Sequence, residues 1–408
     1  MVIPIKTLVE LVDGCQIENV VAGLKFKPEK IIYIGFKHTL TDENKSAIET
    51  LFRMKGIDIT IEYEVVGRYK FHAITERLRT IIDNNEECVF DISGGKDIVL
   101  AAIGAVCTEK NTPMVHIDVE SGKVINVNNF DVSYTNEKSV LTIAEAVALN
   151  GCSVIHNPPE DFSWDMTDDF KNDIEVMWGI CKKDCEKWNW QSAVLKNFEK
   201  FFHLSDSFSI DVDVEKLKSQ HQQSHIDSKL LTKLISNGLI LDYSKKGSVI
   251  HFRYKNKQVH ECITKAGDIL ELYSYMLMKE IAVENPGWYD DIDIGVYIDW
   301  DGIINEDSSV IDVKNEIDIV AMRDLIPLFI SCKNGEVPKE ALYELQTVAD
   351  KFGGRFAGKY MLATYVSRNK LSKKYIIQRA QEMGIKLIYD LHLQNRDEFK
   401  NILKTKIK

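Results

Sequence analysis

The sequence lacks any uninterrupted apolar run of the ~18 residues that a membrane-spanning helix needs, although 45% of its 408 residues are hydrophobic. Its eight cysteines are scattered along the chain. They are too sparse for a disulfide framework, which favours a reducing compartment. The N-terminal Met1–Lys6 lacks the basic region and long apolar stretch of a signal peptide. These absences predict a soluble, cytoplasmic protein without a membrane partner.

Internal repeats, low-complexity linkers and the common nucleotide motifs are absent as well. No complete P-loop or G-x-G-x-x-G pattern occurs, which argues against ATP hydrolysis and dinucleotide redox chemistry. The formal net charge of −11 argues against non-specific coating of nucleic acid by the whole surface. It leaves room for a local basic groove, and the lysine- and arginine-rich C-terminal segment is either such a groove or a solvated helix face.

A chain of this length predicts two or three domains. Up to about residue 150, short β-branched runs such as Thr7–Val12 and Ile31–Phe36 alternate with helical patterns such as Asn44–Met54. This alternation predicts a mostly parallel, doubly wound sheet. Ligands bind such sheets beyond the carboxyl ends of the strands.

The remaining chain divides into two further regions. Residues 151–260 form a helical connecting region that ends in a helix, Ser228–Asn237, and a hairpin, which together resemble a winged-helix unit. The helix offers few cations, Lys229 and Lys233, so a spacer is favoured over a DNA-binding unit. Residues 261–408 predict a helix leading into an α/β layer. The predicted fold class is therefore α/β, with a Rossmann-like first domain.

A glycine pair marks a candidate ligand site in the first region. Ser93-Gly94-Gly95-Lys96 leaves an apolar strand and enters a helix. Glycines allow close approach of the backbone to a ligand, and free N–H groups at a helix start attract anions. A second turn, Asp13–Gln16, follows the first strand, and topology places both turns at the same edge of the sheet.

With the strand Thr7–Val12 and the helix start at Gln16, these turns resemble the CRISPR-associated Rossmann-fold (CARF) sensor domain. The whole chain resembles the CARF-plus-nuclease effectors of type III CRISPR systems. The resemblance implies a homodimer that binds a cyclic oligoadenylate, most often cyclic tetra-adenylate, as an allosteric activator. It also implies residues 1–150 as the sensor domain. The implied ligand contacts are Gln16, Ser93, Gly94, Gly95 and Lys96.

The third region carries a carboxylate and a lysine on two apolar runs that predict adjacent strands. Asp318 lies in the first run and Lys333 ends the second. Hydrolysis of a phosphodiester needs an activated water and neutralised charge, which divalent ions held by carboxylates, together with a lysine, can supply. The pair resembles the PD-(D/E)xK nucleases, which implies a restriction-endonuclease-like domain over residues 261–408.

One expected acid is missing, because Ser331 stands where this class has its second carboxylate. A hydroxyl is a poor ligand for Mg²⁺ or Mn²⁺. Two glutamates could replace the acid: Glu271 on the leading helix and Glu344 on the helix after Lys333. The predicted metal ligands are Asp318, with Glu271, Glu344 or both, and the carbonyl of Cys332. All three acids and Lys333 are candidate catalytic residues.

These patterns predict a metal-dependent endonuclease that cyclic tetra-adenylate activates and that cleaves DNA, RNA or both in antiviral defence. One alternative is a ligand-controlled DNA-binding regulator with an inactive nuclease domain. Another is an enzyme that degrades the cyclic nucleotide in the sensor itself. The regulator would have no need of Glu271, Asp318, Lys333 and Glu344, and no clear catalytic base lies near Ser93–Lys96.

Overall fold

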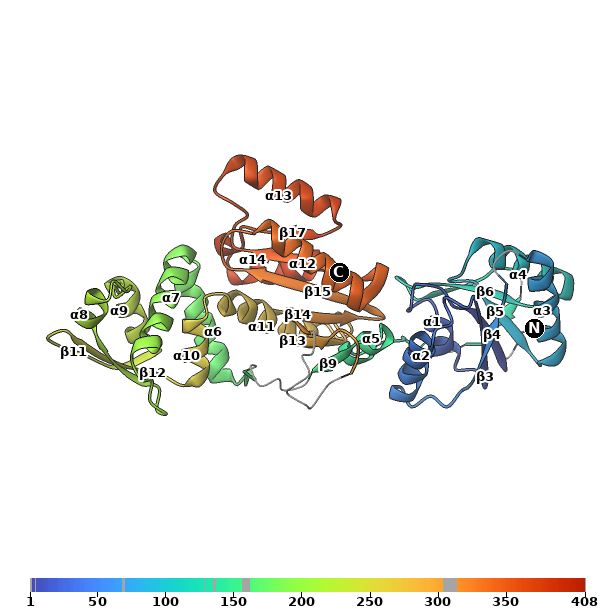
Figure 1. Cartoon of the computed structure of the whole chain (residues 1–408), viewed down its shortest axis with the longest axis horizontal. Helices are drawn as coiled ribbons and strands as arrows, with labels where there is room; N and C mark the ends of the chain where they lie inside the picture. The colour runs from blue at the N-terminus through green and yellow to red at the C-terminus, as the bar shows by residue number, and fades with distance from the viewer. Residues whose placement is uncertain are drawn as a thin grey trace.

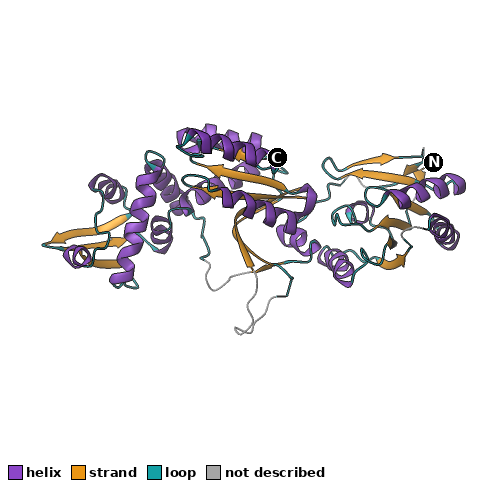
Figure 2. Cartoon of the chain, turned by 45° about the horizontal axis from the view of Figure 1, so that its top comes forward, coloured by secondary structure: helices purple, strands orange, loops and turns teal. Residues whose placement is uncertain are grey.

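The computed structural model describes residues 2–3, 5–67, 70–128, 130–134, 137–155, 162–303 and 314–407. It is elongated, with the first region at one end, the middle region at the other and the C-terminal region between them (Figure 1). Each region has its own sheet, as the turned view separates them (Figure 2). Over the residues so described, no helix combines the length and the apolar character needed to cross a bilayer.

The first region is the doubly wound sheet expected from its alternating pattern. Its strand order is β4-β3-β2-β5-β6-β7, and all neighbours are parallel except β6 and β7. Helices α1 and α2 pack on one face of the sheet and α3 and α4 on the other. The strands and helices are β2 Thr7–Leu11, α1 Val21–Phe26, β3 Lys30–Gly35, α2 Asp42–Met54, β4 Thr60–Val65, α3 Phe71–Asn84, β5 Cys88–Asp91, α4 Asp97–Lys110, β6 Met114–Asp118 and β7 Lys123–Asn126. Outside this sheet, β1 (Val2–Ile3) pairs with β8 (Asp131–Val132).

The middle region consists of helices around a three-stranded sheet of order β10-β12-β11. Asp227 caps α9, and β11 and β12 form the antiparallel hairpin that follows it. This is the winged-helix-like arrangement expected from the sequence. The elements are α6 Asp168–Cys181, α7 Cys185–Phe201, β10 Ser209–Asp213, α8 Val214–Ser219, α9 Ser228–Ser236, β11 Ile240–Lys246, β12 Val249–Tyr254 and α10 Lys257–Thr264.

The C-terminal sheet is mixed, with the order β17-β16-β15-β14-β13-β9. Strands β13, β14 and β15 are antiparallel, whereas β15, β16 and β17 are parallel. Helix α11 packs on one face and α12 on the other. The elements are α5 Ile143–Leu149, β9 Ser153–Ile155, α11 Asp268–Glu284, β13 Asp291–Asp299, β14 Lys314–Arg323, β15 Ile326–Lys333, α12 Lys339–Gly353, η1 Gly354–Phe356, β16 Gly358–Ala363, α13 Lys370–Glu382, β17 Lys386–Ile388, η2 Leu391–Leu393 and α14 Arg396–Lys406.

The pairing of strand β9 crosses the predicted boundary between the middle and C-terminal regions. Strand β9 lies just after residue 150, yet it pairs with β13 as the edge of the C-terminal sheet. The boundaries at 150 and 260 stay predictions, and they divide this sheet between the middle and C-terminal regions. A short strand near residue 150 thus pairs with a strand about 140 residues further along the chain. Local sequence patterns do not predict such a pairing.

Helix α5 connects the first region to the C-terminal sheet. Its Glu145 forms an ion pair with Lys55, the residue directly after α2, with Nζ 2.7 Å from Oε2. Its first backbone N–H, at Ile143, donates to Asp291 of β13. One apolar cluster runs without a break from α2 through α5 to α12. The two domains therefore share a packed interface rather than a loose linker.

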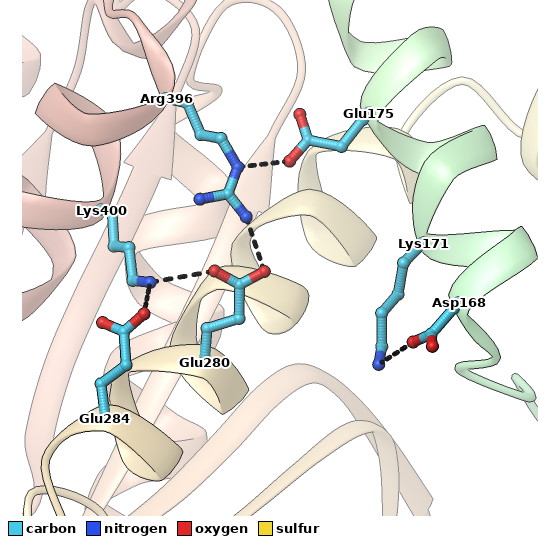
Figure 3. A network of polar contacts seen from close by, with 7 residues as sticks. All are labelled: Asp168, Lys171, Glu175, Glu280, Glu284, Arg396 and Lys400. Carbon is cyan, nitrogen blue, oxygen red and sulfur yellow. Dashed lines mark hydrogen bonds and ion pairs between the residues drawn. The ribbon is translucent and has the colours of Figure 1, made fainter.

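The basic C-terminal helix forms ion pairs with acidic residues of neighbouring helices (Figure 3). Arg396 contacts Glu175 of α6 and Glu280 of α11, each at 2.6 Å. Lys400 contacts Glu280 and Glu284 at 3.0 and 2.6 Å. These two cations hold α14 against α6 and α11, so they serve the fold rather than an open basic groove.

Candidate active site and ligand site

The hairpin of β14 and β15 brings Asp318 and Lys333 together. Its two-residue turn starts at Asp324, whose φ of 58° is one that Asp tolerates better than most residues. The Nζ of Lys333 lies 3.7 Å from Oδ2 of Asp318. Both side chains remain partly exposed, at 30% and 20%, so a substrate can reach them.

The ladders around Asp318 are interrupted on both sides. β14 pairs with β15 from Arg323 as far as Ile319, and the pairing stops there. On the other side, β14 pairs with β13 in a single register, in which Gly295 and Asp318 face each other without being paired. Gly295 has a φ of 62°. These gaps leave Asp318 outside the regular pairing on both of its sides. Here they let β14 part from β15 at the residue that carries the carboxylate.

Ser331 takes a role that the sequence did not reveal. Its hydroxyl donates to Oδ2 of Asp318 at 3.1 Å, and the backbone N–H of Cys332 donates to the same oxygen at 2.5 Å. The serine therefore orients the carboxylate instead of supplying a second one. Cys332 itself is 3% exposed, and its thiol packs toward α11, where burial raises its pKa well above the ordinary value.

Glu271 supplies a further carboxylate that interacts with Asp318. It lies in the first turn of α11, and burial, followed by the charge of Asp318, raises its pKa well above the usual range. Asp268, one turn earlier, has its pKa raised to about 7, mainly by burial. Burial is the main cause of both raised pKa values, and neighbouring carboxylates add to it.

Glu344 is not brought to this site. It is exposed on α12, which packs on the opposite face of the sheet from α11. No contact joins it to Asp318 in the described parts of the chain. The face of the sheet on which each helix packs decides which glutamate lies near Asp318. The sequence does not show it, because Glu271 and Glu344 occupy similar positions in their helical patterns.

The acidic residues fit a divalent cation in charge and chemistry. Carboxylate oxygens are the ligands that Mg²⁺ and Mn²⁺ prefer. A cation would relieve the repulsion from Asp318, which adds to burial in raising the pKa of Glu271. Within the ranges that the structure describes, no three His, Cys, Asp or Glu side chains stand as a finished metal site. Two close carboxylates and a lysine are what the fold provides.

Asn334, directly after Lys333, is a further residue that sequence patterns missed. Its side-chain amide donates to the backbone oxygen of Ala266 at 3.1 Å and to Oδ1 of Asn189 in α7 at 2.9 Å. The backbone oxygen of Lys333 accepts from Thr364 at 3.1 Å. These bonds fix the end of β15 against the middle region, and with it the base of the lysine.

The glycine turn of the first domain lies against the turn after β2. Gly95 donates its N–H to Oδ2 of Asp13 at 3.0 Å. Its φ of 114° suits only glycine, and an added Cβ would come within 2.2 Å of Cδ1 of Leu11. The shared edge of the two turns, inferred from topology, is therefore seen directly.

The other predicted ligand residues surround this turn. The Ser93 hydroxyl donates to Asp91 at 2.6 Å and accepts from the backbone N–H of Ile117 at 2.7 Å, so it braces the turn. Gln16 donates to Asn44 at 2.8 Å. Lys96 is exposed at the start of α4, where a cation is available to an anionic ligand.

Glu18 links this turn to the C-terminal domain. It is a buried residue, 4% exposed, whose Oε1 accepts an ion pair from Nη2 of Arg355 in η1. The ion pair places Arg355 against the sensor-like domain. Neither residue stands out in the sequence, because they are far apart along the chain.

Comparisons with known proteins agree with this organisation. Residues 261–407 match the family model described as the Card1-like endonuclease domain. A search of curated proteins finds no match. The fold is similar to protein VC1899 from Vibrio cholerae, at 18% identity and a TM-score of 0.71, over 98% of this chain and 97% of that one.

A second solved structure has the same overall fold. It is Can2 from Sulfobacillus thermosulfidooxidans in complex with cyclic tetra-adenylate, at 17% identity and a TM-score of 0.69, over 98% of each chain. The resemblance found in the sequence and the predicted fold class, a Rossmann-like domain joined through a winged-helix-like region to a nuclease-like domain, are both confirmed.

Proposed function

We propose that this chain, in which residues 261–407 match a Card1-like endonuclease domain, is a metal-dependent endonuclease of type III CRISPR defence that a cyclic oligoadenylate activates. The observation that carries the proposal is the pairing of Asp318 with Lys333 beside Glu271, at the point where β14 parts from β15. A nuclease needs these three groups together. A DNA-binding regulator does not.

Each group has a distinct role in the proposed reaction. Asp318, oriented by Ser331 and the Cys332 N–H, and Glu271 would hold one or two Mg²⁺ or Mn²⁺ ions, with the Cys332 carbonyl as a further ligand. A bound divalent ion supplies an activated water and neutralises phosphoryl charge.

Lys333, with its ammonium 3.7 Å from Asp318, orients the water and stabilises the negative charge that develops on the phosphorus oxygens. The water oxygen forms the new P–O bond, and the departing sugar oxygen leaves with a proton. Glu344 remains a weaker candidate ligand, since it would have to reach the site by a rearrangement of α12.

The proposed activator is cyclic tetra-adenylate, bound at Gln16 and Ser93–Lys96. Support comes from Lys96, exposed beside the glycine turn, and from Can2, which has the same fold and was solved with this ligand. A cyclic ligand with repeated units suits a site formed by two copies of the chain, so we propose a homodimer in which each subunit contributes both turns.

One cleavage assay tests the proposal. Purified protein with Mn²⁺ would be incubated with supercoiled plasmid and with labelled DNA and RNA single strands, with cyclic tetra-adenylate, with linear tetra-adenylate or with neither. We expect cleavage that requires both Mn²⁺ and the cyclic ligand and that stops on addition of EDTA.

The other outcomes identify the competing functions. Tight duplex binding without any cleavage would favour a regulator that uses the middle region. Loss of the cyclic ligand itself, with all nucleic acids intact, would favour a ligand-degrading enzyme. Either result would overturn the proposed nuclease.

A further inference from the structure

The ion pair of Glu18 and Arg355 joins the two proposed sites. The two residues lie 337 positions apart, one before α1 of the first domain and one in η1 of the C-terminal domain. The side chain of Glu18 is 4% exposed and that of Arg355 is 62% exposed. A buried carboxylate thus depends on an accessible cation from the other domain.

Glu18 lies directly against the glycine turn. A Cβ added to Gly94 would lie 3.1 Å from Cβ and 3.4 Å from Oε2 of Glu18, and 3.7 Å from Oδ2 of Asp13. The Oε2 atom of Glu18 is buried and has no hydrogen-bond partner among the residues that the structure describes. Burial raises the pKa of Glu18, and the charge of Arg355 acts in the opposite direction.

An anionic ligand at Gly94–Lys96 would disturb this arrangement. Its phosphates would approach two carboxylates, Glu18 and Asp13, and like charges at this range repel. The same phosphates would attract the guanidinium of Arg355, for which they are good bidentate acceptors. Ligand binding and the Glu18–Arg355 ion pair therefore compete.

Arg355 is also tied to the strand that carries Lys333. It lies in η1 between α12 and β16, and both ends of this turn pack tightly on β15. A Cβ on Gly353 would lie 2.6 Å from Phe329, and one on Gly358 would lie 2.7 Å from Leu328. β16 then pairs with β15 up to Lys333. Such close contact means that η1 cannot shift without moving β15.

We propose that the Glu18–Arg355 ion pair is a restraint that holds the ligand-free nuclease domain in an inactive position, and that an oligoadenylate phosphate releases it by competing for Arg355. The inference rests on the proposed function, because it assigns the contact by which the sensor controls the nuclease. A ligand shifts such an equilibrium only through different affinity for the two states, and the ion pair supplies that difference.

The test compares Arg355→Gln, Glu18→Gln and the double variant with the wild-type protein. Each variant should cleave without ligand faster than the wild type, on the order of tenfold, within the usual range of coupling between sites. Affinity for cyclic tetra-adenylate, measured by calorimetry, should rise in Glu18→Gln, which removes the competing carboxylate and keeps Arg355 for the phosphate. In ligand-free cleavage the double variant should resemble either single variant, because both remove the same contact.

Two further variants serve as controls. Arg77→Gln breaks an ion pair with Glu64 inside the first domain, and it should leave ligand-free cleavage unchanged. Arg355→Lys keeps the charge and should retain most of the dependence on ligand. Unchanged ligand-free cleavage in Arg355→Gln would overturn the restraint. So would unchanged or weaker ligand binding in Glu18→Gln, because the carboxylate would then not compete with the phosphate.

Hydrogen exchange separates this inference from the proposed function. If the wild type shows no ligand-dependent cleavage, the proposed function fails. The restraint is then judged by backbone exchange at residues 92–98 and 353–363, without ligand. Faster exchange in both segments of Arg355→Gln, but not of Arg77→Gln, supports it, and no change in residues 92–98 overturns it.

Discussion

The first and C-terminal domains both build a site at a sheet, but from different parts of it. In the first domain, parallel strands end at one edge, and two turns meet there through backbone groups such as the Gly95 N–H. In the C-terminal domain, side chains just beyond the paired part of an antiparallel hairpin form the site, where β14 parts from β15. One site depends on backbone shape and the other on side-chain charge.

This difference predicts how each site responds to mutation. A site of backbone turns fails when a glycine gains a side chain, because no other residue adopts its conformation. A site of charged side chains fails when a single charge is removed, although the fold remains intact. The predictions below test this contrast, beginning with the change that should have the largest effect.

Lys333→Ala should reduce ligand-activated cleavage by about 10²- to 10³-fold, the usual cost of removing a group that stabilises charge in the transition state. Affinity for cyclic tetra-adenylate should be unchanged. Lys359→Ala is the matched control, since Lys359 lies on the neighbouring strand and pairs with Asp350 at 3.4 Å. Metal-dependent cutting at the wild-type rate by Lys333→Ala would falsify the assignment.

Glu271→Gln should lower cleavage by at least about tenfold to a hundredfold, as disturbance of a metal site commonly does. Glu344→Gln should stay close to wild type, because Glu344 is exposed on the other side of the sheet. The melting temperature of Glu271→Gln should not fall, since a neutral amide relieves the repulsion from Asp318. The reverse ranking of the two variants would assign the metal ligand to α12.

Gly95→Ala should weaken ligand binding and cost roughly 1–3 kcal/mol of stability, because alanine would be strained at a φ of 114° and would clash with Leu11. Gly104→Ala, in α4, is the matched control. It has nothing within 4 Å of the added Cβ and should gain about 0.5–1 kcal/mol. Urea unfolding and calorimetry measure both effects, and equal stabilities would contradict the role of the turn.

Asp91→Asn should flatten the pH dependence of stability. Burial raises the pKa of Asp91 to about 7 in the folded protein, so its contribution to stability is full below the unfolded value, about 3.9, and is lost as the pH rises through 7. The wild type should therefore lose more stability than Asp91→Asn between pH 5 and pH 8 in thermal melts. Asp58→Asn, an exposed control, should follow the wild type.

Local patterns were sufficient for the ligand turns. Gly94 and Gly95 follow an apolar strand and precede a helix, and this order by itself predicts a turn at the carboxyl edge of a parallel sheet. The same patterns did not reveal the bracing role of Ser93, whose hydroxyl bonds to Asp91 and Ile117. Such contacts depend on how neighbouring strands align, which residue types do not specify.

The members of the proposed nuclease site were predicted from the sequence, but their arrangement was not. The sequence identifies Asp318 and Lys333 as charged residues on two predicted strands, and the hairpin of these strands brings them into an ion pair. The sequence did not predict which of Glu271 and Glu344 lies near Asp318, because each belongs to a helix that packs on the sheet. Ser331 suggested a missing ligand, whereas in the structure it donates a hydrogen bond to Asp318.

The sequence by itself determined the strand-and-helix order and the residue types of both proposed sites, because periodicity and glycine placement act over a few residues. Only the tertiary structure decided that Glu271 joins Asp318, that Asn334 is held by the middle region and that Arg355 meets Glu18. These contacts join residues far apart in the chain. Their formation depends on which faces of helices and sheets pack together, and a short sequence pattern does not specify this packing.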